Sequence, residues 1–170
     1  MTLKHPTWSM PAGEGELIMM PCPGTKDVDL ESTVSQLKAQ GVTAILSMMA
    51  EEEMERLDAA HLPDVCKQNH IQWYNLETGD HKTPDSEALA KWEQYKGKLV
   101  EVIRQGGKIA VHCKGGTGRT GVGTAMILLE LGWTADQAIA DVKALKPGAF
   151  AHELTVAFIK DRAETLKESA

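Results

Sequence analysis

The segment HCKGGTGRT at residues 112–120 constrains this chain more than any other, because it joins an apolar run to a helical pattern. Residues 108–111 before it predict a strand, and the apolar run 122–131 after it, closed by Gly132, predicts a helix. The turn between them contains three glycines, whose backbones adopt conformations that other residues resist: Gly115, Gly116 and Gly118. Successive N–H groups can therefore point into one concavity at a helix N-terminus, which favours a bound anion.

Four side chains of this segment predict chemistry on that anion. Thiolate, not thiol, is a nucleophile, and inward-pointing amides at a helix start favour the anion, so we expect Cys113 to be ionised at neutral pH. Arg119 can return across the loop and hold two phosphate oxygens with its planar fork. The Thr120 hydroxyl can reach the sulfur and steady it as a leaving group. We expect His112 to orient the loop through hydrogen bonds, since an ionised thiol needs no base.

A glycine-rich turn or a lone cysteine would be weak evidence, but the spacing H-C-x5-R-[ST] is specific. It resembles the signature of the cysteine-dependent protein tyrosine phosphatase superfamily. The short dual-specificity branch, which includes kinase-associated phosphatase, is similar in three further segments, at residues 23–27, 79–85 and 146–149, so the resemblance covers about residues 20–160. It implies hydrolysis of phosphate monoesters through a cysteinyl-phosphate intermediate, without metal or cofactor. It also implies that the following residues bind the substrate phosphate: Lys114, Gly115, Gly116, Thr117, Gly118 and Arg119.

The family also uses a general acid, carried as an Asp on a mobile loop upstream of the cysteine. Asp80 occupies that position, and a positioned proton donor contributes on the order of 100- to 10,000-fold. Glu77 is the principal alternative, and His81 is another. Asp85 has a structural explanation, because Thr83-Pro84 predicts a helix start with an acid in its first turn.

One departure from the family concerns the water that cleaves the intermediate. Relatives often carry a Gln shortly after the Pro-Gly-Ala turn, where this chain has Ala151, His152 and Glu153. Asp80 acting as the base of the second step is one way to position this water. His152 and Glu153 are other candidates, although an exposed pair at a helix start is the simpler interpretation.

The remaining pattern predicts an α/β fold with a single central, mostly parallel sheet of about five strands flanked by helices. Strands are expected at residues 17–20, 43–48, 71–76 and 108–112, and an edge hairpin begins within residues 10–16. Helices are expected at residues 27–40, 51–60, 84–105, 118–131, 135–146 and 151–167, with a short helix around Cys66. The acidic run 51–53 favours a first helical turn over a metal site.

Composition places the chain among ordinary globular proteins, with 42% hydrophobic and 25% charged residues. We expect residues 1–170 to form a single phosphatase domain, cytoplasmic and monomeric, without a membrane span. The net charge of −6 disfavours nucleic acid as a partner, so attraction for phosphate must be local. Lys114 and Arg119 supply it in the loop, and Lys82 and Lys146 are candidates for the rim.

Three cysteines argue against a disulfide framework and for a reducing compartment. Cys22 and Cys66 are expected to be inert more often than to pair with an oxidised Cys113. The six histidines show no metal-ligand spacing, so we expect no metal site.

These features predict a phosphatase that acts on phosphoserine, phosphothreonine and phosphotyrosine in proteins. The short chain leaves little room for the added loop with which tyrosine-specific relatives deepen their pocket. An alternative is a phosphoinositide or inositol phosphate phosphatase, because Lys114 resembles the basic loop of lipid phosphatases, although Thr117 stands where those loops carry a second lysine. A phosphoprotein-binding pseudophosphatase is disfavoured by the presence of both Cys113 and Arg119.

Overall fold

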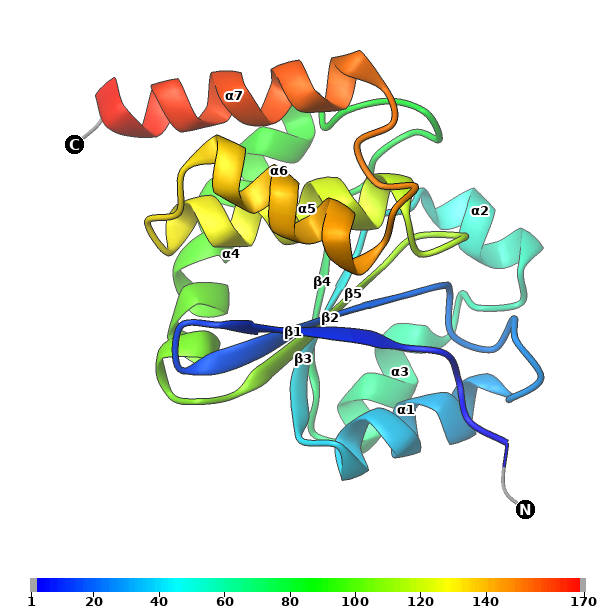
Figure 1. The fold of residues 1–170 in the computed structure, drawn as a ribbon. Helices are drawn as coiled ribbons and strands as arrows, with labels where there is room; N and C mark the ends of the chain where they lie inside the picture. The colour runs from blue at the N-terminus through cyan, green and yellow to red at the C-terminus, as the bar shows by residue number, and fades with distance from the viewer. Residues whose placement is uncertain (1–2, 169–170) are drawn as a thin grey trace.

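A computed structural model of the chain describes residues 3–168, and its centre is one five-stranded sheet (Figure 1). The strands are β1 (Trp8–Ala12), β2 (Gly15–Met20), β3 (Val42–Ser47), β4 (Gln72–Asn75) and β5 (Lys108–His112). Their order is β1-β2-β5-β3-β4; the β1–β2 pair is antiparallel and the other pairs are parallel. The predicted fold class, a mostly parallel sheet of about five strands, is therefore confirmed.

Helices cover both faces of the sheet, which is why its inner strands are apolar runs rather than alternating patterns. Figure 1 shows α1 and α3 on one face and α4 to α7 on the other, with α2 beyond one end of the strands. The helices are α1 (Leu30–Ala39), α2 (Glu51–Arg56), α3 (Leu62–Gln68), α4 (Ser86–Arg104), α5 (Gly118–Glu130), α6 (Ala135–Leu145) and α7 (Glu153–Glu168). Within residues 3–168, none of them is both long and apolar enough to cross a membrane.

Two helix starts differ from the predicted ones because an aspartate caps each of them. The helix predicted from residue 84 begins at Ser86, and Asp85 rather than Thr83 is its N-cap, accepting a hydrogen bond from the amide of Ala88. Likewise α1 begins at Leu30 rather than residue 27, with Asp29 accepting from the amide of Ser32. A carboxylate that accepts a first-turn N–H satisfies a donor that the helix leaves free, so the cap sets the boundary.

Two further predictions are refined. The helix predicted over residues 51–60 ends at Arg56, and Asp58 has a φ of 56°, which does not continue a right-handed helix. The predicted edge hairpin is β1 with β2; it begins at Trp8 and turns at Gly13, whose φ of 56° suits glycine.

The parallel strands bring distant loops together at one edge of the sheet. Strands β2, β3, β4 and β5 all end there, and the chain that follows them carries Cys22, Glu53, Asp80 and Cys113. Two backbone hydrogen bonds join neighbouring loops directly: Cys22 N–H donates to Lys114 O at 3.1 Å, and Met48 N–H donates to His112 O at 3.0 Å. Ligands of open α/β sheets bind beyond the carboxyl ends of the strands, and this edge is such a place.

Candidate active site

Strand β5 delivers Cys113 to the floor of a cleft at this edge. The thiol is 4% exposed, and two donors point at its sulfur: the Thr120 hydroxyl at 3.0 Å and the Gly116 N–H at 3.4 Å. Both donors stabilise negative charge on sulfur, as an anionic nucleophile requires. The structure thus brings together the cysteine and the threonine that the motif singled out.

Gly116 is the one glycine of the loop that its backbone conformation requires. Its φ is 83°, and a Cβ there would lie 2.5 Å from the carbonyl carbon of Met20 and the nitrogen of Pro21. Gly115 and Gly118 have no atom within 4 Å of an added Cβ, and both line the cleft. Of the three glycines predicted to adopt conformations that other residues resist, Gly116 alone has a positive φ; the other two leave open space where the loop faces the cleft.

His112 is buried at the end of β5 and belongs to a chain of hydrogen bonds. Its Nδ1 lies 3.1 Å from the Cys113 carbonyl oxygen, so Nδ1 carries the proton and Nε2 accepts from the Ser47 hydroxyl at 2.6 Å. Trp73 Nε1–H donates to the same hydroxyl at 2.9 Å, which leaves the hydroxyl proton for His112. Burial lowers the pKa of His112 to about 4, against the hydrogen bond to Cys113 O, so the ring is neutral at pH 7.

Sequence reasoning missed both Ser47 and Trp73. Their roles become visible only once the register of the sheet is known. Ser47 pairs with His112 across the β3–β5 ladder, and Trp73 lies on β4, the next strand. A hydroxyl at the end of one parallel strand is in reach of an imidazole at the end of its neighbour. Only the strand order shows that these two strands are neighbours.

Arg119 is 4% exposed, and residues outside the cysteine loop hold its guanidinium in place. Its Nη1 donates to Glu53 Oε1 at 2.7 Å and to the Thr78 carbonyl at 2.9 Å, and its Nη2 donates to Glu53 Oε2 at 3.0 Å. The acidic run that was assigned only to the helix dipole therefore has a second role through Glu53. The signal for it was chemical, because a buried arginine requires a carboxylate partner.

The hydrogen bonds of Arg119 leave a defined pair of donors for a ligand. A guanidinium has five N–H groups. Three of them are donated to Glu53 and Thr78, which leaves Nε–H and one Nη2–H. These two are the parallel pair on the side edge of the guanidinium, the geometry that holds two oxygens of one phosphate.

The two charges of this pair also keep each other ionised. Burial opposes ionisation of Glu53, but the hydrogen bonds and the charge of Arg119 outweigh it and lower the pKa of the carboxyl. Burial likewise opposes the charge on Arg119, and Glu53, followed by Cys113, raises its pKa. The guanidinium is therefore held charged and in one orientation before substrate binds.

We expect Glu53→Gln to lower kcat/KM on the order of 10- to 100-fold, since one acceptor and the paired charge are lost and Arg119 is no longer held in place. Inhibition by inorganic phosphate should weaken in parallel, because the same fork binds it. Glu52→Gln on the exposed side of the same helix is the matched control and should retain both values. Rates within twofold of wild type for Glu53→Gln would show that the loop alone orients Arg119.

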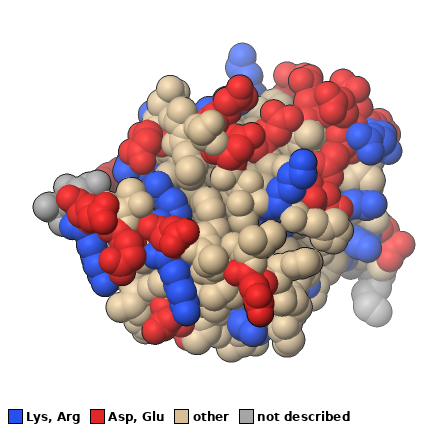
Figure 2. Space-filling view, turned by 90° about the horizontal axis from the view of Figure 1, so that it is seen from above, with Lys and Arg blue, Asp and Glu red and all other residues tan. Residues whose placement is uncertain are grey.

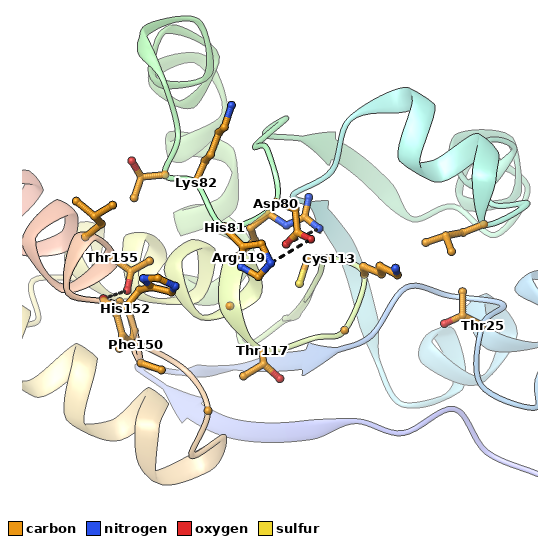
Figure 3. Close-up of a pocket in the computed structure, with 18 of the residues that line it drawn as sticks. Thr25, Asp80, His81, Lys82, Cys113, Thr117, Arg119, Phe150, His152 and Thr155 are labelled. Carbon is orange, nitrogen blue, oxygen red and sulfur yellow. Dashed lines mark hydrogen bonds and ion pairs between the residues drawn. The ribbon is translucent and has the colours of Figure 1, made fainter.

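Asp80 lines the same cleft as Cys113, whereas Glu77 lines a separate recess with Lys82, Asp85 and Lys91. Asp80 Oδ1 lies 3.6 Å from Arg119 Nη2, and its Oδ2 lies 3.6 Å from His81 Nε2. Figure 3 shows Asp80 beside Arg119, with the sulfur of Cys113 close by. Of the two acids, Asp80 is the one with access to a phosphate bound at the loop.

The cleft has a volume of about 520 Å³ and is lined by cations of three loops. Lys26, Lys82 and Lys114 line it, and Asp80 is the carboxylate among its lining residues. The chain's net charge of −6 is therefore reversed locally, as expected for a phosphate site. Lys26 was not singled out from the sequence. Lys146 does not line the cleft; its ammonium lies 3.4 Å from the centre of the Trp8 ring.

Two of the three residues at the position of the family's glutamine lie in the wall of the cleft. Ala151 and His152 line it, whereas Glu153 does not, and the His152 ring lies 6.3 Å from that of His81. His152 thus has access to the cleft from the start of α7. Glu153, as predicted, is an exposed residue of the first helical turn.

The other two cysteines are buried neutral thiols. Burial raises the pKa of Cys66 to about 12, and burial together with the charges of Cys113 and Glu53 raises the pKa of Cys22 to about 12. All three cysteines are free. Among residues 3–168, no three His, Cys, Asp or Glu side chains gather in a way that would hold a metal ion.

The fold and the cysteine loop together define a cysteine-dependent phosphatase, and comparison with known proteins identifies its family. The model of the Swiss Army Knife protein DSP-PTPase phosphatase domain matches residues 15–165. The chain belongs to this dual-specificity phosphatase family. Protein tyrosine phosphatase domain-containing protein 1 of Mus musculus is 28% identical over 142 residues, which are 78% of this chain and 18% of the relative.

The chain is also similar to a further curated relative in sequence and to two solved structures in fold. Tyrosine-protein phosphatase CDC14 of Candida albicans is 43% identical over 93 residues, 52% of this chain and 16% of that protein. The chain spans less than a fifth of the length of the curated relatives it matches. Kinase associated phosphatase has a similar structure, with a TM-score of 0.85, 20% identity and 98% of both chains covered. PTPMT1 in complex with PI(5)P has a TM-score of 0.75 at 17% identity, with 95% of this chain and 98% of that chain covered. At these identities the two structures show a shared fold.

Proposed function

We propose that this phosphatase hydrolyses phosphoserine, phosphothreonine and phosphotyrosine in proteins through a cysteinyl-phosphate intermediate, without metal or cofactor. One observation carries the proposal: the Cys113 sulfur accepts hydrogen bonds from the Thr120 hydroxyl and from the Gly116 amide. Arg119 lies at the end of the same loop. Lys114 to Arg119 supply the backbone amides of the phosphate cradle. His112 supports the loop from below through its bond to the Cys113 carbonyl.

In the first step the Cys113 thiolate attacks phosphorus, an S–P bond forms, and the bond from phosphorus to the substrate oxygen breaks. Asp80 donates its proton to the departing oxygen, which leaves as an alcohol or phenol. The free Nε–H and Nη2–H of Arg119 hold two of the equatorial oxygens as charge spreads over them. Thr120 is the donor that remains on sulfur throughout.

In the second step water attacks phosphorus and the S–P bond breaks, which releases inorganic phosphate and restores the thiolate. Asp80, now ionised, takes the proton from the attacking water. The Thr120 hydroxyl stabilises the departing thiolate, since it already donates to the sulfur at 3.0 Å. His152 lines the cleft close to the position where relatives carry the glutamine, and it helps Asp80 to hold this water.

We favour protein over phosphoinositide substrates because the basic side chains are spread around the cleft instead of gathering in the loop. Lys114 is the single lysine of the cradle, and Thr117 stands at the position of the second basic residue. Lys26 and Lys82 approach from separate loops. All three cysteines are free, which supports a cytoplasmic location. We also infer that residues 1–170 are one domain that acts as a monomer.

The test compares kcat/KM on a phosphothreonine peptide, a phosphotyrosine peptide and phosphoinositide vesicles, for the wild type and Lys114→Ala. We expect the two peptides to be better substrates than the vesicles. Lys114→Ala should lower kcat/KM for all three substrates. If the wild type prefers phosphoinositides, and Lys114→Ala loses most activity on them, the lipid function replaces this one.

Activity should be the same in excess EDTA, because the mechanism uses no metal. A loss of activity that a divalent ion restores would contradict the mechanism.

A further inference from the structure

The start of α7 forms one wall of the cleft, and this wall contains a leucine that does not pack in the hydrophobic core. Leu154 is 70% exposed, and it lines the cleft together with Phe150 and Ala151. Among the described residues, only Leu3, at 63%, is a comparably exposed large hydrophobic side chain. Burial of apolar surface is favourable, so an exposed leucine beside a substrate site is a candidate for contact with substrate.

The helix itself does not explain Leu154. Helix α7 packs on the core through Val156, Phe158, Ile159, Ala163 and Leu166. At 100° per residue, Leu154 lies roughly 160° around the axis from Val156 and roughly 40° from Phe158, one turn further along. Phe158 is partly buried, whereas Leu154 is 70% exposed, so the leucine side chain is free to contact a ligand of the cleft.

The cleft is larger than the phosphate cradle at its floor. Its volume of about 520 Å³ leaves room for groups on both sides of a bound phosphoryl group. Figure 3 shows Phe150, His152 and Thr155 on one side of Cys113 and Thr25 on the other. A substrate whose phosphate is held at Cys113 can therefore place a neighbouring group along the Phe150–Leu154 wall.

Phe150 supports this wall with a constrained backbone. Its φ is 58°, in the left-handed region that a bulky residue rarely adopts, and its side chain is 5% exposed. Such conformations persist where packing holds them, and they gather at ligand sites. The buried ring gives the apolar wall a fixed base, from which the chain continues to Leu154.

The charges around the wall favour a protein over a membrane as the partner. Helices that lie on anionic membranes carry lysine and arginine along their polar face. Helix α7 mixes both signs on its exposed surface, with Glu153, Asp161 and Glu164 beside Lys160 and Lys167, and the chain as a whole carries −6. Figure 2 shows the face on which α7 lies: an uncharged band crosses its middle, and acidic as well as basic side chains surround the band.

We propose that Phe150 and Leu154 form an apolar subsite that binds a large aliphatic or aromatic side chain next to the phosphorylated residue of a protein substrate. Leu154 is the specificity-determining residue of this subsite. The proposal rests on the proposed function, since it requires a protein substrate.

The experiment uses phosphopeptides that are identical except for one residue, Leu in one peptide and Ser in the other, placed at each flanking position in turn. The readout is the ratio of the two kcat/KM values, which is measured separately for each enzyme variant. Partial burial of one leucine side chain corresponds to a ratio of about ten in the wild type, at the flanking position that reaches the wall. We expect Leu154→Ser to reduce this ratio to about two or less, and Leu154→Met to retain most of it.

Leu3→Ser is the matched control, since it removes an equally exposed leucine that does not line the cleft, and its ratio should equal that of the wild type. A ratio near one at every position in the wild type, or an unchanged ratio in Leu154→Ser, would overturn the subsite while leaving the protein phosphatase function intact. If para-nitrophenyl phosphate is hydrolysed but no phosphopeptide is, the proposed function fails and the subsite fails with it. Sedimentation with phosphatidylcholine–phosphatidylserine vesicles that Leu154→Ser abolishes, together with a flat peptide ratio, would assign Leu154 to a membrane instead.

Discussion

Replacement of Cys113 by serine should abolish turnover and leave the fold and phosphate binding largely intact. The serine hydroxyl fills the same position and can keep its contacts with Thr120 and Gly116, but it is not ionised at pH 7 and is a poor nucleophile. We expect steady-state hydrolysis of para-nitrophenyl phosphate to fall below detection. Inorganic phosphate should still bind in calorimetry, and the melting temperature should change by no more than a few degrees.

Cys66→Ala controls for the loss of a buried thiol, since this residue is neutral and does not line the cleft. It should retain turnover even if its stability decreases. Measurable steady turnover by Cys113→Ser would contradict the assignment of the nucleophile. The hydrogen bonds from Thr120 and Gly116 to the sulfur would then have no role in stabilising a nucleophilic thiolate.

The second large effect is expected for Asp80→Asn, and it should depend on the leaving group. The alkoxide of phosphothreonine is a poor leaving group that needs a proton, so its hydrolysis should slow on the order of 100- to 10,000-fold. An aryl phosphate with a stabilised phenolate should slow much less. The measurement is the ratio of the two rate losses, which should be large if Asp80 protonates the leaving group.

Glu77→Gln is the matched comparison, because Glu77 is the other acid of the same loop and lines a different recess. It should cost little with either substrate. If Glu77→Gln slows phosphothreonine hydrolysis strongly and Asp80→Asn does not, the general acid is Glu77. The assignment of Asp80 then fails, although the nucleophile would be unaffected.

The strands and helices were largely predictable because each depends on neighbours in sequence. Strand β5 has the predicted bounds, and α5 and α6 begin where expected, with Thr134 accepting from the Gln137 amide at the start of α6. The errors lie at helix ends, where Asp29 and Asp85 rather than the residues before them act as caps. Several polar residues near each start are possible caps, and the hydrogen bonds from the amides of Ser32 and Ala88 identify the two that act as caps.

The contacts of the candidate site are of two kinds, those between residues close in sequence and those between residues far apart. Cys113, Thr120 and the loop amides lie within one turn of the chain, so their mutual geometry follows from the local sequence. Glu53 is 66 residues from Arg119, and Ser47 is 65 residues from His112. No local pattern distinguishes Glu53 from the two glutamates before it, which remain exposed.

The sequence by itself determined the nucleophile loop, the α/β class and the family, because a strand, a glycine turn and a helix with fixed side chains form a unit whose physics is local. The tertiary structure alone decided which acid shares the cleft with Cys113, which glutamate holds Arg119 and which leucine the core leaves exposed beside them. The physical reason is the strand order. Placing β5 between β2 and β3 brings the loops after four strands to one edge of the sheet, where groups distant in sequence come within hydrogen-bonding distance.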